Sequence, residues 1–414
     1  MSTIADPLGQ KDKIKPLWRN RDYLILTSGN GISAIGSQVS LVAFPLLFLA
    51  LTHSPAQAGL MSAVRNLPTV LLMLPAGALV DRWDRKRLMI VCDTGRALAL
   101  GSIPFALWLG HLSSLQLYVV ALLEGTLAVF FSLAMAASIP RIVEQEQIPD
   151  ATAQEQTIES LAGTIGPTLG PILYGLGGMI PFLTDAISYA CSVVSLLFIK
   201  TRFQEERVAD GAGISSLWKE IKEGMVWLWH SPLLRFLALH TFGLITPCYG
   251  YVLLIIVLGQ RLHVSDVTLG LIFGAGGLGS ILGAVVITPL YRRFGFYKVL
   301  VGTTWLWALG WLLYAFAPNA WVLGIGNVIG FVVVPMYMVV QYSYRLKVTP
   351  DHLQGRVNSV FRLIAFGGQP LGMWITGLLL QWVGPINAVL LLFLPQGILA
   401  IAVTFNRRVR NASL

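Results

Sequence analysis

Four acidic residues lie inside stretches that are otherwise apolar, and they are the first candidates for chemistry. They are Asp93, Glu124, Glu159 and Asp185. An ionisable group inside a membrane segment is costly and is therefore a functional candidate by default, because a carboxyl group there can bind and release a proton. Glu124 lies in the middle of its stretch and is the leading candidate for coupling to protons or cations. The alternative interpretation is a protonated carboxyl group that only bonds a neighbouring helix.

Most of the other charged residues within apolar stretches lie nearer the ends. Asp93 and Arg96 are one helical turn apart, close to the charged loop that precedes them, and are predicted to belong to a gate. Glu159 and Asp185 lie about one turn inside their stretches and could be solvated without a special purpose. Arg65 lies deeper, and its pairing with Asp185 is one hypothesis.

The elements that must position these residues are membrane-spanning helices. Of the 414 residues, 55% are hydrophobic and only 12% are charged, which is far from the composition of a soluble domain. Windows long enough to cross a bilayer can be assigned twelve times. They lie near 22–51, 57–80, 88–109, 114–139, 155–178, 180–199, 232–260, 267–290, 297–316, 319–344, 354–379 and 385–405.

The placement of Lys and Arg predicts the orientation. Nearly all of them fall in loops on the side of the amino terminus, and only Arg261 lies in a loop on the other side. Basic short loops stay in the cytoplasm, so we expect a multi-pass protein of the plasma (cytoplasmic) membrane with both termini cytoplasmic. The same pattern explains the net charge of +9 without nucleic-acid binding, since the charges form no basic stripe.

The polar segment 200–231 divides the spans into two sets of six. The expected organisation is a cytoplasmic amino-terminal segment 1–21, a six-helix bundle 22–199, a linker 200–231, a second bundle 232–405 and a tail 406–414. Within the linker, apolar residues at helical spacing predict an amphipathic helix on the membrane surface, with an ordinary solvated connector as the alternative. These residues are Leu217, Trp218, Ile221, Met225 and Leu228.

One short loop concentrates charge between two spans. The run from Gly77 to Leu88 holds Asp81, Arg82, Asp84, Arg85, Lys86 and Arg87. It resembles the loop signature of the major facilitator superfamily, although Asp84 replaces a usual glycine. The segment from Arg292 to Gly295 resembles a degenerate second copy of this loop in the other half. Asp93 with Arg96, and the segments 130–140 and 231–235, resemble the branch of drug:proton antiporters that contains macrolide and siderophore exporters.

The resemblance implies an all-α polytopic membrane protein with twelve transmembrane helices in two pseudo-symmetric six-helix bundles. The fold would place the glycine-rich second, fifth, eighth and eleventh spans at the seam between halves, where small residues allow close approach. The residues expected to pack there are Gly166, Pro167, Gly170, Gly274, Gly279 and Gly283. The residues expected in a cytoplasmic gate are Gly77, Asp81, Arg82, Arg85, Lys86, Asp93, Arg96 and Arg356, with Asp81 facing Arg356.

The resemblance also implies a central cavity between the first, fourth, seventh and tenth spans. Its expected lining is Asn30, Gln38, Glu124, His240, Tyr249, Tyr251, Asn327, Tyr337 and Gln341. This mixture of aromatic and uncharged polar groups favours a bulky amphiphilic solute over a small sugar. Proton coupling is assigned to Glu124, Asp93, Glu159 or Asp185.

The expected function is secondary active transport, namely proton-coupled efflux of bulky amphiphilic molecules of the drug, macrolide or siderophore type by alternating access. The alternatives are an importer, a facilitator or a lipid flippase on the same fold. A non-transporting membrane enzyme or sensor is an alternative of another class. The sequence offers no paired nucleophile and base and no metal-binding cluster, so we expect no enzyme activity, cofactor or metal. The expected partners are the substrate, protons and membrane lipids, with the chain acting as a monomer.

Overall fold

The computed structural model describes residues 16–201, 203–204 and 214–412, and in these ranges the chain is helical with no strand. The amino half contains α1 (Arg21–Thr52), α2 (Pro55–Val80), α3 (Arg85–Trp108), α4 (Ser114–Ile142), α5 (Ile148–Leu176) and α6 (Ile180–Phe198), preceded by η1 (Leu17–Arg19) and with η2 (Gln145–Gln147) before α5. The carboxy half contains α8 (Pro232–Ile245), η3 (Thr246–Gly250), α9 (Tyr251–Arg261), α10 (Asp266–Ala315), α11 (Ala320–Val348), η4 (Asp351–Leu353), α12 (Gln354–Phe366) and α13 (Gln369–Phe405). Between the halves lies α7 (Ile214–His230), and α14 (Arg407–Arg410) follows α13.

These helices form twelve membrane-spanning segments. Within the described ranges, eight stretches are long and apolar enough to span a membrane, and two of them, in α10 and α13, contain a break. The breaks are at Gly295 (φ 73°) and Gly384 (φ 78°), in a left-handed conformation that glycine adopts at little cost. Each of these stretches therefore holds two spans, and α2 and α5 complete the twelve. The predicted all-α fold in two bundles of six is confirmed.

The helix ends agree with the predicted windows, apart from a few turns at the polar ends. The fifth helix begins at Ile148, although its predicted window begins at residue 155, because its first two turns are polar. A hydropathy window excludes such turns, but Asp150 in the first turn favours helix there.

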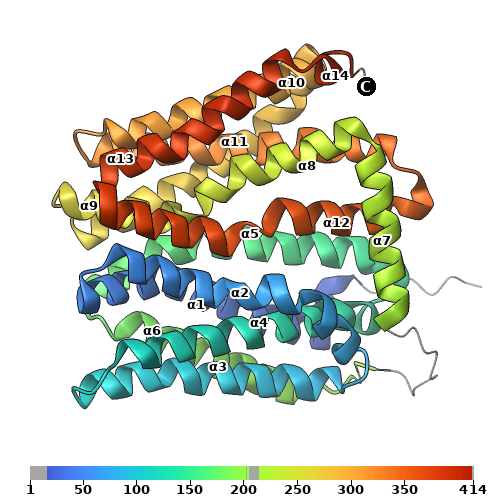
Figure 1. Cartoon of the computed structure of the whole chain (residues 1–414). Coiled ribbons are helices and arrows are strands. Elements are labelled where there is room, and N and C mark those ends of the chain that lie inside the picture. Colours follow the sequence, from blue (N-terminus) through green and yellow to red (C-terminus); the bar gives the residue numbers. More distant parts are fainter. Residues whose placement is uncertain (1–15, 202, 205–213, 413–414) are drawn as a thin grey trace, which may run out of the picture.

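The connector between the halves contains the expected helix, α7. Figure 1 shows it crossing the end of the bundles, roughly perpendicular to the spans. It is held there by an ion pair between Glu223 and Arg356 on α12 (2.6 Å). The side chains of Leu217 and Trp218 lie outside the described part, as does segment 1–15. The domain boundaries themselves stay a prediction.

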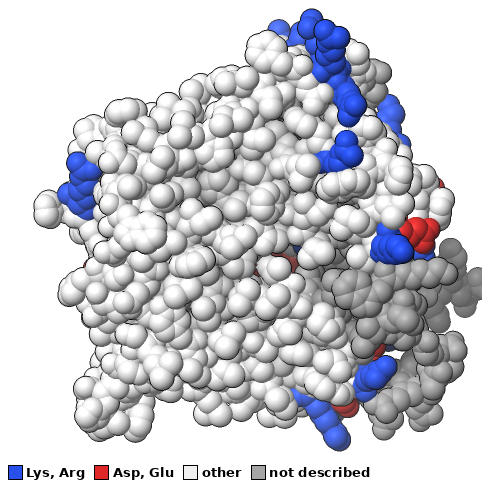
Figure 2. Space-filling view, in the orientation of Figure 1, with Lys and Arg blue, Asp and Glu red and all other residues white. Residues whose placement is uncertain are grey.

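The charged residues gather at one end of the molecule. In Figure 2 the basic side chains of the face shown collect at the end where α7 lies, with a small basic area at the opposite end and a wide, mostly uncharged band between them. We call these the α7 end and the opposite end. The band has the character of a lipid-facing surface.

The two halves meet toward the opposite end. Ser54 at the start of α2 donates a hydrogen bond to Gln381 (3.0 Å), and Gln369 donates one to Asn66 (3.0 Å). Between these contacts Gly59 faces Gly377 so closely that a Cβ atom on Gly59 would lie 2.8 Å from the Cα atom of Gly377. On the other side of the seam, Gly270 and Gly274 of α10 pack against Thr168 of α5.

Toward the α7 end the same helices separate. The side chains of Leu71 and Met73 on α2 are 61% and 47% exposed, and that of Leu161 on α5 is 53% exposed. The halves are therefore closed at the opposite end and apart at the α7 end.

Most of the glycines predicted at the seam pack within their own half. Only Gly274 makes the predicted contact across the seam. Gly166 and Gly170 instead approach α1, at Gln38 and Val39, and Gly279 and Gly283 approach α11, at Val328 and Val332. Pro167 is buried in the middle of α5. Small residues four apart favour a close helix neighbour but do not specify which one.

The contact at Gly59 gives a first prediction. Gly59→Ala places a methyl group against backbone atoms at 2.7 and 2.8 Å, so we expect it to weaken the closed seam and to raise the population open at the opposite end. A cysteine introduced at Ser62 would then react several-fold faster with a membrane-impermeant maleimide. Gly163→Ala is the matched control, because no atom lies within 4 Å of the added Cβ. Equal labelling rates in the two variants would show that this contact does not hold the seam.

Candidate functional site

Five charged side chains meet in the interior of the amino half. This charged cluster consists of Arg65 on α2, Asp93 and Arg96 on α3, Glu124 on α4 and Asp185 on α6. Asp93 and Asp185 are fully buried, and Glu124 is 2% exposed. Burying a charge without a partner is costly, so the partners of each group decide its charge state.

Glu124 bridges the two arginines. Its Oε2 atom accepts from Nε of Arg65 (2.5 Å), and its Oε1 atom accepts from a terminal nitrogen of Arg96 (3.0 Å). The hydroxyl of Tyr189 donates to the same Oε1 atom (3.3 Å), and the Arg96 guanidinium lies over the Tyr189 ring at 3.9 Å. Two cations and a hydroxyl favour the ionised carboxylate. Glu124 is therefore a structural counter-ion in this state.

Asp93 and Arg96 form a pair within the cluster. Arg96 donates to Asp93 (3.4 Å) and also to the hydroxyl of Ser37 on α1 (3.2 Å). These two residues were predicted to belong to a gate near the charged loop. The structure instead buries both in the cluster, because the charge of Arg96 is satisfied by Glu124 in the bundle interior.

Asp185 is surrounded differently. Among the described residues its side chain is bonded by hydroxyl groups, those of Ser40 on α1 and Ser188 (3.2 Å). The predicted pair of Arg65 with Asp185 is wrong, since Arg65 bonds Glu124. Hydroxyls can donate to a carboxylate and can equally accept from a protonated carboxyl group. Asp185 is thus the acid of the cluster whose partners fit both protonation states.

The charges of the cluster do not balance. Two arginines face three acids, so the fully ionised cluster carries one negative charge in a buried site. One bound proton makes it neutral, and neutrality is strongly favoured where water is excluded. The excess of one acid makes the cluster a candidate site for one exchangeable proton.

A polar pocket of about 190 Å³ adjoins the cluster. Arg96 belongs to both, and Ser37 lines the pocket. The hydroxyl of Ser37 lies 2.6 Å from that of Tyr189, which reaches Glu124. A chain of hydrogen bonds thus links the pocket to the cluster. The pocket also contains Glu155 and Glu159 of α5, together with Asn30 and Gln38 of α1, which the sequence assigned to a central cavity.

An aromatic pocket of about 240 Å³ lies in the carboxy half. Its walls come from the end of α8, η3, α9, the second span of α10, α11 and the end of α12, with Cys248 and Met338 among the aliphatic and sulfur-bearing groups. Its aromatic side chains are Tyr249, Tyr251, Trp307, Trp311, Tyr314, Phe331 and Phe366. Flat rings and sulfur atoms of this kind suit apolar and aromatic ligands, and also cations through their π faces.

A third pocket of about 220 Å³ joins the two halves. It shares Tyr249 and Tyr251 with the aromatic pocket and reaches Ser62 of α2 and Leu41 of α1. The three cavities place aromatic groups in the carboxy half and polar or acidic groups in the amino half.

Of the other predicted cavity residues, Glu124 belongs to the buried cluster and the rest pack inside the carboxy half. Nδ1 of His240 lies 2.9 Å from the hydroxyl of Tyr337, and Asn327 donates to the carbonyl oxygen of Ile272 (2.7 Å). Gln341 accepts from Arg345 (2.8 Å). Buried polar groups find partners inside a bundle, so polarity alone does not identify a cavity wall.

Sequence reasoning missed Trp307, Trp311 and Tyr314, because the family arrangement places the ninth span outside. Their spacing of four and three residues on one helical face is the signal that could have found them.

The loop expected to form a gate is anchored within its own half. Arg85 donates to the carbonyl oxygen of Ala137 (2.7 Å) and to Asp81 (3.4 Å), and Lys86 donates to the carbonyl oxygen of Ile199 (2.7 Å). The predicted contact of Asp81 with Arg356 is absent, since Arg356 bonds Glu223 on α7 and the halves are apart at this end.

Three comparisons place the chain among transport proteins. The family described as transmembrane secretion effector matches residues 14–412. The multidrug efflux pump Tap of Mycolicibacterium fortuitum is 26% identical over 404 residues, which cover 95% of this chain and 96% of the relative. The enterobactin exporter EntS of Salmonella typhimurium is 24% identical over 340 residues, covering 81% and 80%.

Solved structures share the fold. The nucleoside transporter NupG aligns with a TM-score of 0.76 at 14% identity, over 95% of this chain and all of that one. A bacterial homologue of the lysosomal transporter Spinster, in an inward-facing and unoccupied conformation, aligns with a TM-score of 0.74 at 15% identity, over 95% and 98%.

Proposed function

The chain belongs to the transmembrane secretion effector family of the major facilitator superfamily, and from this premise we propose that it exports bulky amphiphilic molecules by proton-coupled alternating access. The observation that carries the proposal is the different lining of the cavities in the two halves. Aromatic groups in the carboxy half would hold the apolar part of a substrate, while the polar pocket with Glu155 and Glu159 would hold its polar or cationic part. The names of the relatives, a multidrug efflux pump and an enterobactin exporter, support export of this class.

The two halves, 22–199 and 232–405, would rock against each other around these cavities. The α7 end would face the cytoplasm, because basic residues gather there, and both termini would lie on that side of the cytoplasmic membrane. The structure would then be the inward-facing state, in which substrate binds from the cytoplasm. Both halves of the pathway lie in one chain, so we expect a monomer to be active.

Proton coupling would use the charged cluster. In the outward-facing state Asp185 would take up a proton and make the cluster neutral. In the inward-facing state the proton would leave through the polar pocket, and the negative charge left on the cluster would favour a cationic substrate in that pocket. The proton would thus be bound to the cluster only when the substrate is absent from the polar pocket, and this alternation is what antiport requires.

The membrane test uses purified protein in liposomes with a transmembrane pH gradient. We expect a panel of amphiphilic compounds to move against their gradients, with protons moving the other way. Movement of substrate down its gradient alone would indicate a facilitator, and movement with protons would indicate an importer. Movement of phospholipid between leaflets would indicate a flippase, and no movement of any solute would favour a sensor or enzyme.

The aromatic pocket gives a second prediction. Trp311→Ala removes a ring from the pocket wall, so we expect KM for aromatic substrates to rise about 10-fold with little change in kcat, because the lost contact is made in the bound state. Trp321→Ala is the matched control, since that ring is 83% exposed on α11 and belongs to none of the three cavities. An unchanged KM in the Trp311 variant would remove this pocket from the substrate path.

A further inference from the structure

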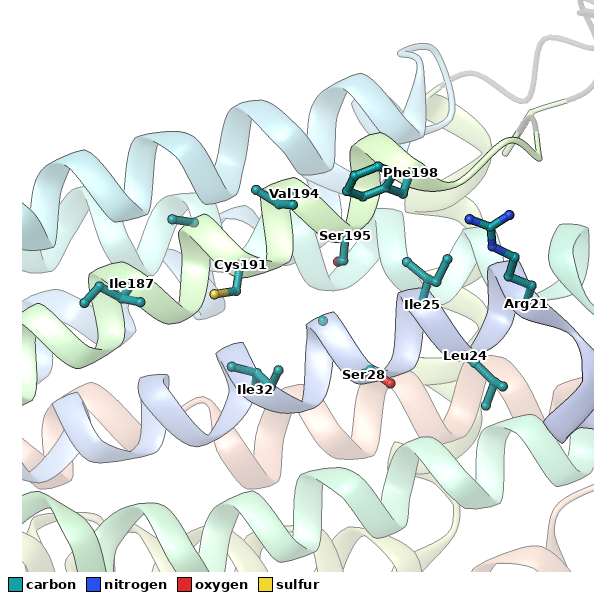
Figure 3. Close-up of a pocket in the computed structure, with 12 residues that line it drawn as sticks. Arg21, Leu24, Ile25, Ser28, Ile32, Ile187, Cys191, Val194, Ser195 and Phe198 are labelled. Atoms are coloured by element: carbon teal, nitrogen blue, oxygen red, sulfur yellow. The ribbon is translucent and has the colours of Figure 1, made fainter.

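A long groove runs along the outside of the amino half, between α1 and α6. Its volume is about 760 Å³, and it is separate from the three central cavities. Figure 3 shows the groove with side chains from both helices along it. The apolar side chains that flank it are Leu24, Ile25, Ile32, Ile187, Val194 and Phe198.

Small residues line the space between the two helices. Ser28, Gly29, Cys191 and Ser195 belong to the lining, and Gly29 lies so close to Ser195 that an added Cβ atom would overlap its hydroxyl. The helices therefore touch at this line, while larger side chains rise on either side. The result is a channel with small residues along its base and apolar side chains along its walls.

The length of the groove matches one leaflet of a bilayer. From Arg21 to Ile32 on α1, and from Ile187 to Phe198 on α6, a helix rises about 16 Å. The hydrocarbon core of a bilayer is about 30 Å thick, so half of it is close to that length. The groove would run from the membrane surface to about the midplane.

A cation lies at the α7 end of the groove. Figure 3 shows the Arg21 guanidinium beside the end of α6 that carries Phe198. Its neighbour Asp22 is occupied by the backbone amides of Lys200 and Thr201 (3.2 and 2.9 Å) and by the Thr201 hydroxyl (2.5 Å). Arg21 is exposed, and among the described residues it makes no hydrogen bond or ion pair, although its charge acts on the neighbouring Asp22. Its guanidinium can therefore bind an anion outside the protein.

We infer that this groove binds an anionic phospholipid of the cytoplasmic leaflet, with the phosphate on Arg21 and one acyl chain between α1 and α6. The choice of occupant rests on three matched features: an apolar channel, the length of one leaflet and a cation at the headgroup level. It also rests on the proposed orientation, which puts the α7 end in the cytoplasm. Because the opposite face of α1 carries Asn30 and Ser37 of the polar pocket, the bound lipid would support the helix that lines the substrate path.

The experiment uses Cys191, the exposed one of the three cysteines, as a reporter inside the groove. The full chain, with Cys92 and Cys248 replaced by alanine, is labelled at Cys191 with a small fluorophore. It is placed in liposomes that contain phosphatidylglycerol or phosphatidylcholine with brominated acyl chains, which quench on contact. We expect the anionic lipid to quench about fivefold more effectively per mole, as one basic side chain near the surface predicts. Arg21→Gln should abolish this preference and leave quenching by phosphatidylcholine unchanged.

The control label lies on another lipid-facing surface. Leu98→Cys on a Cys191→Ser background reports from α3, where residue 98 is 71% exposed and outside the groove, and it should show no headgroup preference. Equal quenching by both lipids at Cys191 would overturn the inference, as would relief of quenching by transported compounds, which would make the groove a substrate site. The measurement requires no transport, so its failure is distinct from failure of the proposed function.

Discussion

Asp185→Asn is expected to abolish the exchange of protons for substrate while leaving the binding of uncharged amphiphilic substrates intact. Asparagine has the shape of the protonated acid and can bond the hydroxyls of Ser40 and Ser188, so the fold should survive. It cannot release a proton, so the cluster stays neutral in both states. In liposomes, substrate-driven proton movement should fall to background, while exchange of labelled for unlabelled substrate should continue at near the normal rate. The pH dependence of transport should disappear with it.

A matched control for this variant is Glu159→Gln. Glu159 is an acid of the polar pocket that is exposed to solvent, so its removal should weaken the binding of cationic substrates without changing the ratio of protons to substrate. If Asp185→Asn still moves protons at the normal ratio, the proton site lies elsewhere in the chain.

Glu124→Gln is expected to damage the fold and not only the activity. The substitution removes the carboxylate that pairs with both Arg65 and Arg96, and it leaves the buried Arg65 without its ion-pair partner while Arg96 keeps Asp93. Removing one partner of a buried pair typically costs about 3–5 kcal/mol, a large part of the stability of a domain. We expect the midpoint of thermal unfolding in detergent to fall by several degrees, as measured by size-exclusion chromatography after heating. The yield of purified protein should also be reduced.

The double variant Arg65→Met with Glu124→Gln separates loss of an ion pair from loss of a functional acid. It removes one cation together with the anion, so it should recover part of the lost stability. If Glu124→Gln alone folds with unchanged stability and has lost proton movement, then Glu124 is the coupling acid that the sequence favoured, and the assignment to Asp185 is wrong.

The order and extent of the spans could be predicted because the bilayer imposes them. Backbone polar groups in the hydrocarbon layer must be paired within helices, so each span is a helix that is visible in the sequence as an apolar window. The breaks at Gly295 and Gly384 therefore fall between predicted spans. The polar start of α5 at Ile148 was missed for the same reason, since those turns lie beyond the apolar layer.

The site could be predicted only in part. The acids of the cluster were found because charge inside an apolar stretch is visible in one helix at a time. The partners of these acids could not be predicted. The ion pair between Arg65 and Glu124 joins two helices, and the local sequence does not show how these helices are rotated relative to each other. The same limit explains why Gly279 was assigned to the seam, and why Trp307 and Trp311 were not assigned to a pocket.

The two halves carry different chemistry, and this has an evolutionary consequence. The charged cluster lies in the amino half, whereas the rings that would select a compound lie mainly in the carboxy half. Substitutions among those rings can change the spectrum of exported compounds without disturbing the group that draws on the proton gradient. Under selection by a new toxic compound, we expect adaptive changes to accumulate in the second half of the gene while the first half keeps its energy source unchanged.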